Sequence, residues 1–280
     1  VLLLIMVFGS AMRQVLYDGI VAVPLAFKLA LTASLAGLIY LTAPIGSDDS
    51  QPPSVEMDSN EQGEAIDPAA VGEIRGTVLL TGTPPEPEQL TLFAGCETLA
   101  DEPIYDDRVV ASDGKLKNTF IWIRQGWERW AVPPAPAAEV ELDQRACVYK
   151  PRVLGARVDQ PITFINSDPL FHNVRTVIGE RSVFNLNMPA QDQRITRTFK
   201  RPEVMVQARC DVHPWMRSYI GVVPHPWFAI SAEDGSFALT GVPPGEYVVE
   251  AWHEVYGTQT ATVTVTARGE AEQSFTFAAE

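Results

Sequence analysis

The chain has 280 residues, 46% of them hydrophobic, which is enough for one large domain or two small ones with real hydrophobic cores. Its formal net charge is -14, and no cluster of Lys or Arg is visible. Phosphate binding needs a basic surface, so this charge argues against a nucleic-acid partner and favours a basic one.

The first predicted element is a membrane-directed segment within residues 1–45. Lys28 is the only charged residue between residues 19 and 47, and about 20 apolar residues are enough to span a bilayer. The run of residues 29–45 is short for a span by itself and becomes adequate if the stretch from residue 19 contributes. Arg13 and Lys28 precede this uncharged run and acidic residues follow it, so the positive-inside rule places the N-terminus in the cytoplasm and the rest outside. A cleaved signal peptide is the alternative, but Pro44 directly after Ala43 disfavours cleavage there, and we expect an uncleaved anchor.

Residues 46–71 form an acidic segment rich in Ser, Asp, Glu, Pro and Gln, with little to bury. This composition predicts a disordered tether between the membrane and the folded part. From residue 72 onward, short segments alternate apolar and polar residues between Gly and Pro, which is typical of strands in a sandwich or barrel. The predicted strands are residues 74–80, 119–123, 140–142, 162–165, 204–206, 237–239, 247–251 and 261–265.

A group of potential metal ligands follows one of these strands. Cys210, His213 and Met216 lie in one short segment, and Pro214 between them favours a tight turn. His172, just after another predicted strand, supplies a fourth side chain. Two imidazoles, a thiolate and a thioether are the ligand set of a blue-copper site, whereas zinc more often recruits a second Cys or a carboxylate.

The spacing of Cys210, His213 and Met216, together with His172 followed by Asn173, resembles the copper loops of small cupredoxins, most closely the amicyanin and pseudoazurin group. The resemblance implies that His172 and His213 bind equatorially, that Cys210 is the thiolate and that Met216 is the axial ligand. It also implies that Asn173 braces the two copper loops by hydrogen bonds. The alternative is a buried Cys210 thiol beside a core histidine, with no metal.

The chain has three cysteines, which cannot all pair with one another. With Cys210 bound to copper, Cys96 and Cys147 remain. Outside the cytoplasm these two are expected to form a disulfide if their Cα atoms lie within about 7 Å. Two separate buried thiols are the alternative.

Two aromatic residues and two further histidines lie near the predicted ligands, beside another predicted strand or at the expected domain junction. Phe171 and Trp215 are neighbours of predicted ligands, and they form either apolar docking surface near the copper or ordinary core. His253 is expected to be hydrogen-bonded between strands, although a second metal site or a docking face is an alternative. His225 lies at an expected domain junction and is assigned no chemistry.

Residues 72–280 resemble bacterial exported proteins that combine a cupredoxin with a carboxypeptidase regulatory-like (transthyretin-like) sandwich, some of them labelled methylamine utilisation proteins. We therefore predict an all-β chain that follows an N-terminal transmembrane or signal helix. A Greek-key cupredoxin sandwich at 137–223 is expected to be inserted in a transthyretin-like sandwich built from 72–136 and 224–280. Two tandem domains are the simpler alternative.

The implied function is that of a type 1 copper protein with one copper per chain, which carries single electrons between redox partners such as a cytochrome or a membrane redox complex. It would act in the periplasm or at the cell exterior, anchored to the cytoplasmic membrane. An electron carrier is favoured over an enzyme, because multicopper enzymes need further His-rich sites and the chain has 4 histidines. The alternative is a copper-holding or metal-free envelope module that binds a partner.

Overall fold

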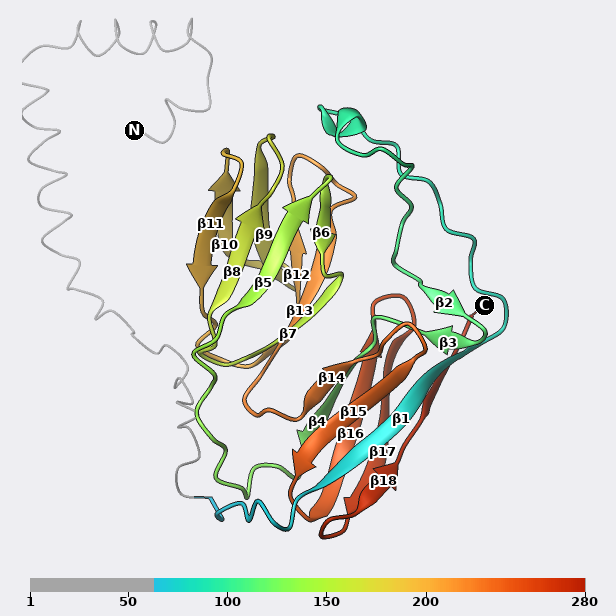
Figure 1. Cartoon of the computed structure of the whole chain (residues 1–280), viewed down its shortest axis with the longest axis vertical. Helices are drawn as coiled ribbons and strands as arrows, with labels where there is room; N and C mark the ends of the chain where they lie inside the picture. Colours follow the sequence, from blue (N-terminus) through green and yellow to red (C-terminus); the bar gives the residue numbers. More distant parts are fainter. Residues whose placement is uncertain (1–62, 280) are drawn as a thin grey trace, which may run out of the picture. The chain divides into compact units, whose positions relative to one another are not determined.

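The computed structural model describes residues 63–279, so the predicted membrane segment and most of the predicted tether lie outside the described part. Within residues 63–279 the chain is all-β, and its one helical element is the short 3-10 helix η1 (Cys96–Thr98). No helix among these residues is long and apolar enough to cross a membrane. Figure 1 shows the strands gathered in two groups.

One group, here called the flanking sandwich, takes its strands from both ends of the described chain. These strands are β1 (Gly72–Thr81), β2 (Ala111–Ser112), β3 (Lys115–Leu116), β4 (Phe120–Gln125), β14 (Phe228–Ile230), β15 (Ser236–Val242), β16 (Gly245–His253), β17 (Gly257–Val265), β18 (Glu270–Glu272) and β19 (Phe275–Ala278). In one sheet β1 pairs antiparallel with β15 and parallel with β18 and β19; the other sheet has the order β14-β4-β16-β17. Early and late segments of the chain therefore share both sheets.

The core of the flanking sandwich lies between these two sheets. Ile74 and Val78 of β1 are fully buried, and they belong to one apolar cluster with Ile121 of β4 and Val249 of β16. In β15, buried and exposed residues alternate over its first half, as expected for a strand with one face on a core. The apolar residues of the alternating sequence pattern thus form the inner face of each sheet.

The second group, here called the inserted sandwich, is formed by residues 140–223 (Figure 1). Its strands are β5 (Val140–Arg145), β6 (Val148–Lys150), β7 (Val153–Arg157), β8 (Ile162–Asn166), β9 (His172–Ile178), β10 (Arg181–Met188), β11 (Gln193–Arg197), β12 (Glu203–Arg209) and β13 (Arg217–Val223). They form sheets of order β10-β9-β12-β13-β7 and β11-β8-β5-β6. Leu142, Phe164, Val174, Val206 and Ile220 are buried in the core that these sheets share.

A long excursion, here called the arm (residues 82–110), connects β1 to β2 and contains η1. Its two halves run beside each other, with a bridge between Gln89 and Tyr105 and a hydrogen bond from Leu90 N to Ile104 O (2.8 Å). Cys96 of η1 is disulfide-bonded to Cys147, between β5 and β6, with their Cα atoms 5.8 Å apart. The arm is thereby attached to the inserted sandwich although it leaves from the flanking one.

The described fold includes residues that precede the predicted boundary at residue 72. Glu64 N donates to Arg129 O (2.8 Å), and Glu64 O accepts from Ala131 N (2.9 Å). The last residues of the predicted tether are therefore part of the fold, because their backbone completes the hydrogen bonding of residues 129–131.

Candidate metal centre

The predicted ligands lie where three neighbouring strands of the inserted sandwich end or begin. His172 is the first residue of β9, and Cys210 directly follows β12. His213 and Met216 lie in the turn between β12 and β13. Because β12 pairs with both β9 and β13, with Arg209 beside Arg175 and Arg217, these segments meet at one end of the sheet.

The segment from Cys210 to Met216 is a closed turn. Cys210 N donates to Met216 O (3.3 Å), and Met216 N donates to His213 O (3.0 Å). Pro214 lies inside this turn, where its restricted backbone favours the reversal. The closed backbone brings the two ends of the segment together and holds His213 between them.

Three nitrogen and sulfur atoms converge at this end of the sandwich. His172 Nδ1 lies 3.0 Å from His213 Nδ1, which lies 3.7 Å from Cys210 Sγ, and all three ligand atoms are within 4.8 Å of one another. His172, Cys210, His213 and Met216 are each 3% exposed or less, and Met216 belongs to the same apolar cluster as Cys210. The cluster offers a soft thiolate and two imidazoles to an ion shielded from solvent, which suits copper in either oxidation state.

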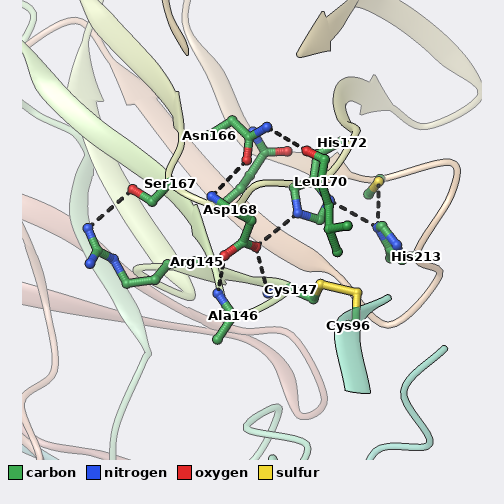
Figure 2. Close-up of polar contacts among 12 residues, drawn as sticks. Cys96, Arg145, Ala146, Cys147, Asn166, Ser167, Asp168, Leu170, His172 and His213 are labelled. Atoms are coloured by element: carbon green, nitrogen blue, oxygen red, sulfur yellow. Dashed lines mark hydrogen bonds and ion pairs between the residues drawn. A yellow bond between two sulfur atoms is a disulfide. The ribbon is translucent and has the colours of Figure 1, made fainter. Parts of the chain in front are cut away.

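Asp168 orients one of the two histidines. His172 Nε2 donates to Asp168 Oδ2 (2.9 Å), so its Nδ1 lone pair faces the other ligand atoms. Figure 2 shows His172 between Asp168 and His213. A histidine that binds a metal commonly donates its second N–H to a carboxylate, which fixes the ring and its tautomer. The residues present therefore fit a bound metal ion.

The same carboxylate ties the disulfide segment to the centre. Asp168 accepts hydrogen bonds from Ala146 N (2.7 Å) and Cys147 N (2.8 Å), at the turn between β5 and β6. Sequence reasoning gave Asp168 no role. A carboxylate four residues before a candidate ligand histidine is the signal that would have identified it.

Asn173 joins the two segments that carry the ligands. Its Oδ1 accepts from Asp211 N (2.8 Å) and from the Cys210 thiol (3.4 Å), while its Nδ2 donates to Asp211 Oδ2 (3.0 Å) and Asn185 Oδ1 (2.7 Å). Its backbone carbonyl accepts from the buried Tyr149 hydroxyl (2.8 Å). These bonds hold the start of β9 against the residue that follows Cys210.

The charges within the cluster are coupled. Burial lowers the pKa of His172, but its bonds to Asp168 and Cys210 outweigh burial and raise that pKa to about 9. Burial raises the pKa of the Cys210 thiol, but His172 and nearby hydrogen-bond donors lower it overall. Burial and the charge of His172 lower the pKa of His213. The pKa values of His172 and Cys210 therefore depend on each other, and that of His213 depends on the charge of His172.

Within the described residues, two further groups have ligand atoms that lie close enough to share an ion, and both include Cys147. The sulfur of Cys147 is bonded to that of Cys96, so neither group offers it as a thiolate. The predicted disulfide is thus present, and Cys210 is the remaining cysteine, buried and unbridged.

Replacing Asp168 with asparagine is expected to weaken copper binding about 10- to 100-fold, because the neutral amide orients His172 less strongly and leaves a backbone N–H of the turn poorly paired. Competition with a chelator of known affinity measures this change. Asp159→Asn is the matched control, since Asp159 is exposed and pairs with Lys200 at the surface. Equal affinities of the two variants would contradict an orienting role for Asp168.

The other two histidines lie outside the cluster. His225 is fully buried: its Nε2 donates to Ile123 O (2.7 Å), and its Nδ1 accepts from Trp227 N (3.2 Å). His253, at the end of β16, accepts from Val255 N (3.2 Å) and stacks on Tyr256. Both rings are held within the flanking sandwich and hydrogen-bond to backbone.

His225 is expected to make the fold sensitive to acid. Burial and the charge of Arg157 lower its pKa from 6.5 to about 4, so the unfolded chain takes up this proton first. The stability that neutral His225 contributes is present above pH 6.5 and is lost as the pH falls toward 4, by about 3 kcal/mol. Urea unfolding of wild type and His225→Gln across this range tests the prediction: the wild type should lose this amount relative to the variant. A pH-independent difference between them would contradict it.

Comparisons with known proteins give local likenesses only. No family model and no curated protein matches the chain. Among solved structures, it is similar to a reduced mutant form of amicyanin, with 27% identity over 32% of this chain and 85% of that chain, and a TM-score of 0.28. A copper-containing nitrite reductase (NirK) from Thermus scotoductus SA-01 has 22% identity and a TM-score of 0.27; the match covers 32% of this chain and 27% of the reductase. A purple cupredoxin from Nitrosopumilus maritimus has 22% identity over 29% of this chain and 97% of that chain, with a TM-score of 0.26.

Proposed function

We propose that this chain is an exported, membrane-tethered type 1 copper protein that carries single electrons. The observation that carries the proposal is the convergence of His172 Nδ1, His213 Nδ1 and Cys210 Sγ in a buried cluster, with Met216 buried in the same apolar core as Cys210. These four residues would hold one copper ion. The bound ion supplies a one-electron couple between Cu(II) and Cu(I).

The surroundings of the cluster favour electron transfer over catalysis. His172 is hydrogen-bonded to Asp168, and Cys210 to Asn173, so these two ligands are oriented by protein groups and not by the metal alone. Four protein ligands leave no position for a substrate, and the ligand side chains are almost fully buried. A braced, dry site changes little between oxidation states, which suits a carrier.

The burial of the ligand side chains also favours an electron carrier over a module that delivers copper to another protein. Delivery requires an ion that exchanges readily, whereas His172 and His213 are 0% and 1% exposed. We therefore expect the site to release copper slowly. Electrons would leave the site while the copper ion stays bound, as in an electron carrier.

The disulfide supports an extracytoplasmic location, because such bonds persist in oxidising compartments. We propose the periplasm or the cell exterior, with residues 1–45 as the anchor in the cytoplasmic membrane and a redox protein, such as a cytochrome, as partner. The direction of insertion follows from basic residues before the apolar segment and acidic residues after it.

Reversible redox cycling in the presence of a chelator tests this function. The full chain, purified in mild detergent and loaded with copper, should keep about one copper per chain while it cycles repeatedly between Cu(I) and Cu(II). Rapid loss of copper to the chelator would favour copper delivery. Failure to bind copper would favour a metal-free binding module.

A further inference from the structure

The arm covers the end of the inserted sandwich at which the candidate ligands lie. The ring of Phe93 packs edge-on against Trp215, with the ring centroids 4.8 Å apart, and lies 6.5 Å from the ring of His213. The disulfide from Cys96 to Cys147 fixes the arm three residues further on, beside the centre (Figure 2). The arm thus contacts both the β12–β13 turn and the β5–β6 turn.

A third contact shows how closely the arm is seated. A side-chain carbon on Gly95 would lie 3.0 Å from Leu170 Cδ2, between β8 and β9, and Gly95 has a φ of 96°. Glycine is therefore suited to this position both by its backbone conformation and by the space available. Leu92 and Leu99 also pack against the core of the inserted sandwich.

Phe93 of the arm is more exposed to solvent than His213, the ligand whose ring it lies near. His213 is 1% exposed, and its Nε2 has no hydrogen-bond partner among the described residues. Phe93, which packs over this region, is 47% exposed. Phe171 and Val212, the neighbours of two ligands in sequence, are 44% and 37% exposed. An approaching molecule would therefore meet the exposed ring of Phe93 before it met the buried His213.

The arm is also strongly acidic. Over residues 82–110 its one basic residue is Arg108, which pairs with Asp106. Its acidic residues are Glu86, Glu88, Glu97, Asp101, Glu102, Asp106 and Asp107. Protein interfaces commonly combine an apolar centre with a charged rim, and complementary charge raises the association rate. Asp106 and Asp107 pair with Arg108 and Arg152, whereas Asp101 and Glu102 are exposed acids of the same arm that carries the exposed ring of Phe93.

We propose that the arm is the docking surface for a basic electron-transfer protein, and that Phe93 is the contact residue through which the partner reaches the copper centre. This proposal rests on the proposed electron-carrier function. One electron would pass from Cu(I) to ferric haem iron of the partner, giving Cu(II) and ferrous iron, with no proton or bond exchanged. The Cys96–Cys147 disulfide holds Phe93 in position for this contact.

Binding by the metal-free chain tests the surface independently of copper. Calorimetry with a commercial basic cytochrome c as the probe should show affinity that falls as ionic strength rises. Phe93→Ala should weaken this binding about tenfold. Val255→Ala is the matched control, because Val255 is an exposed apolar residue (46%) of the flanking sandwich and its loss should change binding less than about twofold.

Two double variants distinguish the effect of the arm's charge on binding from that of the overall negative charge of the chain. Asp101→Asn with Glu102→Gln removes charge from the arm, while Glu246→Gln with Glu272→Gln removes the same charge from exposed positions of the flanking sandwich. The arm pair should weaken binding about threefold or more, and the control pair less. Equal effects of the two pairs, or an unchanged affinity of Phe93→Ala, would overturn the proposal, as would association of the chain with a second copy in place of the cytochrome.

Stopped-flow oxidation of the copper-loaded, reduced chain by ferric cytochrome c completes the test. Phe93→Ala should slow the bimolecular reaction about tenfold while the copper absorption spectrum stays unchanged. An unchanged rate with an intact spectrum would refute the role of Phe93 and leave the electron-carrier function standing. A wild-type protein without a copper–thiolate spectrum would refute the electron-carrier function itself.

Discussion

Replacing Cys96 and Cys147 together with alanine is expected to lower the free energy of unfolding by about 4 kcal/mol. The two residues are 51 positions apart, so their bond closes a long loop in the unfolded chain and removes much of its conformational freedom. Both residues are fully buried, where each alanine also leaves a small unfilled volume. Urea unfolding without reductant measures the difference.

Wild-type protein unfolded in the presence of reductant is the control for the disulfide variant. Its stability should approach that of the variant, since the same cross-link is absent from both. A loss smaller than about 1 kcal/mol in both experiments would mean that the arm is held mainly by its apolar contacts and not by the bond.

Replacing Arg152 with methionine is expected to lower the free energy of unfolding by about 3 to 5 kcal/mol. Arg152 lies between β6 and β7, and its guanidinium makes paired hydrogen bonds with Glu254 (2.7 and 2.6 Å) and a third with Asp107 (2.9 Å). The side chains of Arg152 and Glu254 are 9% and 8% exposed. Removing the cation therefore leaves a buried carboxylate without its counter-charge.

Two further variants test whether the loss of stability comes from burying an unpaired charge. Adding Glu254→Gln to Arg152→Met should restore part of the lost stability, because the double variant buries no unpaired charge. Lys117→Met, which breaks the more exposed pair with Glu233, should cost less than about 1 kcal/mol. Equal losses for Lys117→Met and Arg152→Met would contradict the account, as would a double variant as unstable as Arg152→Met.

The predicted strands correspond to β1, β4, β5, β8, β12, β15, β16 and β17. Their sequences alternate apolar and polar residues or form short apolar runs, so local pattern was sufficient. Strand β10 was not predicted, because polar residues interrupt its apolar ones. Strand β9 contains the polar residues Asn173 and Arg175, and its strand character comes from pairing with β10 and β12. The resemblance placed His172 in a copper loop that follows the strand at 162–165, and the structure places it at the first residue of β9.

The candidate ligands were accessible to sequence reasoning because Cys210, His213 and Met216 lie in one turn and their chemistry is distinctive. Their closeness to His172 depends on the pairing of β9 with β12. The position of Phe93 over Trp215 was not accessible, since nothing local in residues 82–110 indicates which surface they cover. Contacts between distant segments depend on the whole fold, and here on a cross-link as well.

Strand pairing supports a further proposal about chain organisation. Ile74 of β1 lies beside Leu239 of β15, and Ile121 of β4 lies beside Ala251 of β16, although residues 140–223 separate them in sequence. We propose that the flanking sandwich folds as a unit of its own around the inserted one. Deleting residues 140–223 and joining the flanks with a short linker should then leave a folded β-sandwich, detectable by dispersed amide NMR signals.

The visible absorption spectrum of the Cu(II)-loaded full chain, recorded beside that of Cys210→Ser, tests the central claim most directly. We predict an intense blue or green band from charge transfer between the Cys210 thiolate and copper, absent from the variant. A colourless wild-type protein, or a band that persists in Cys210→Ser, would contradict the assignment of His172, Cys210, His213 and Met216 as a type 1 copper site.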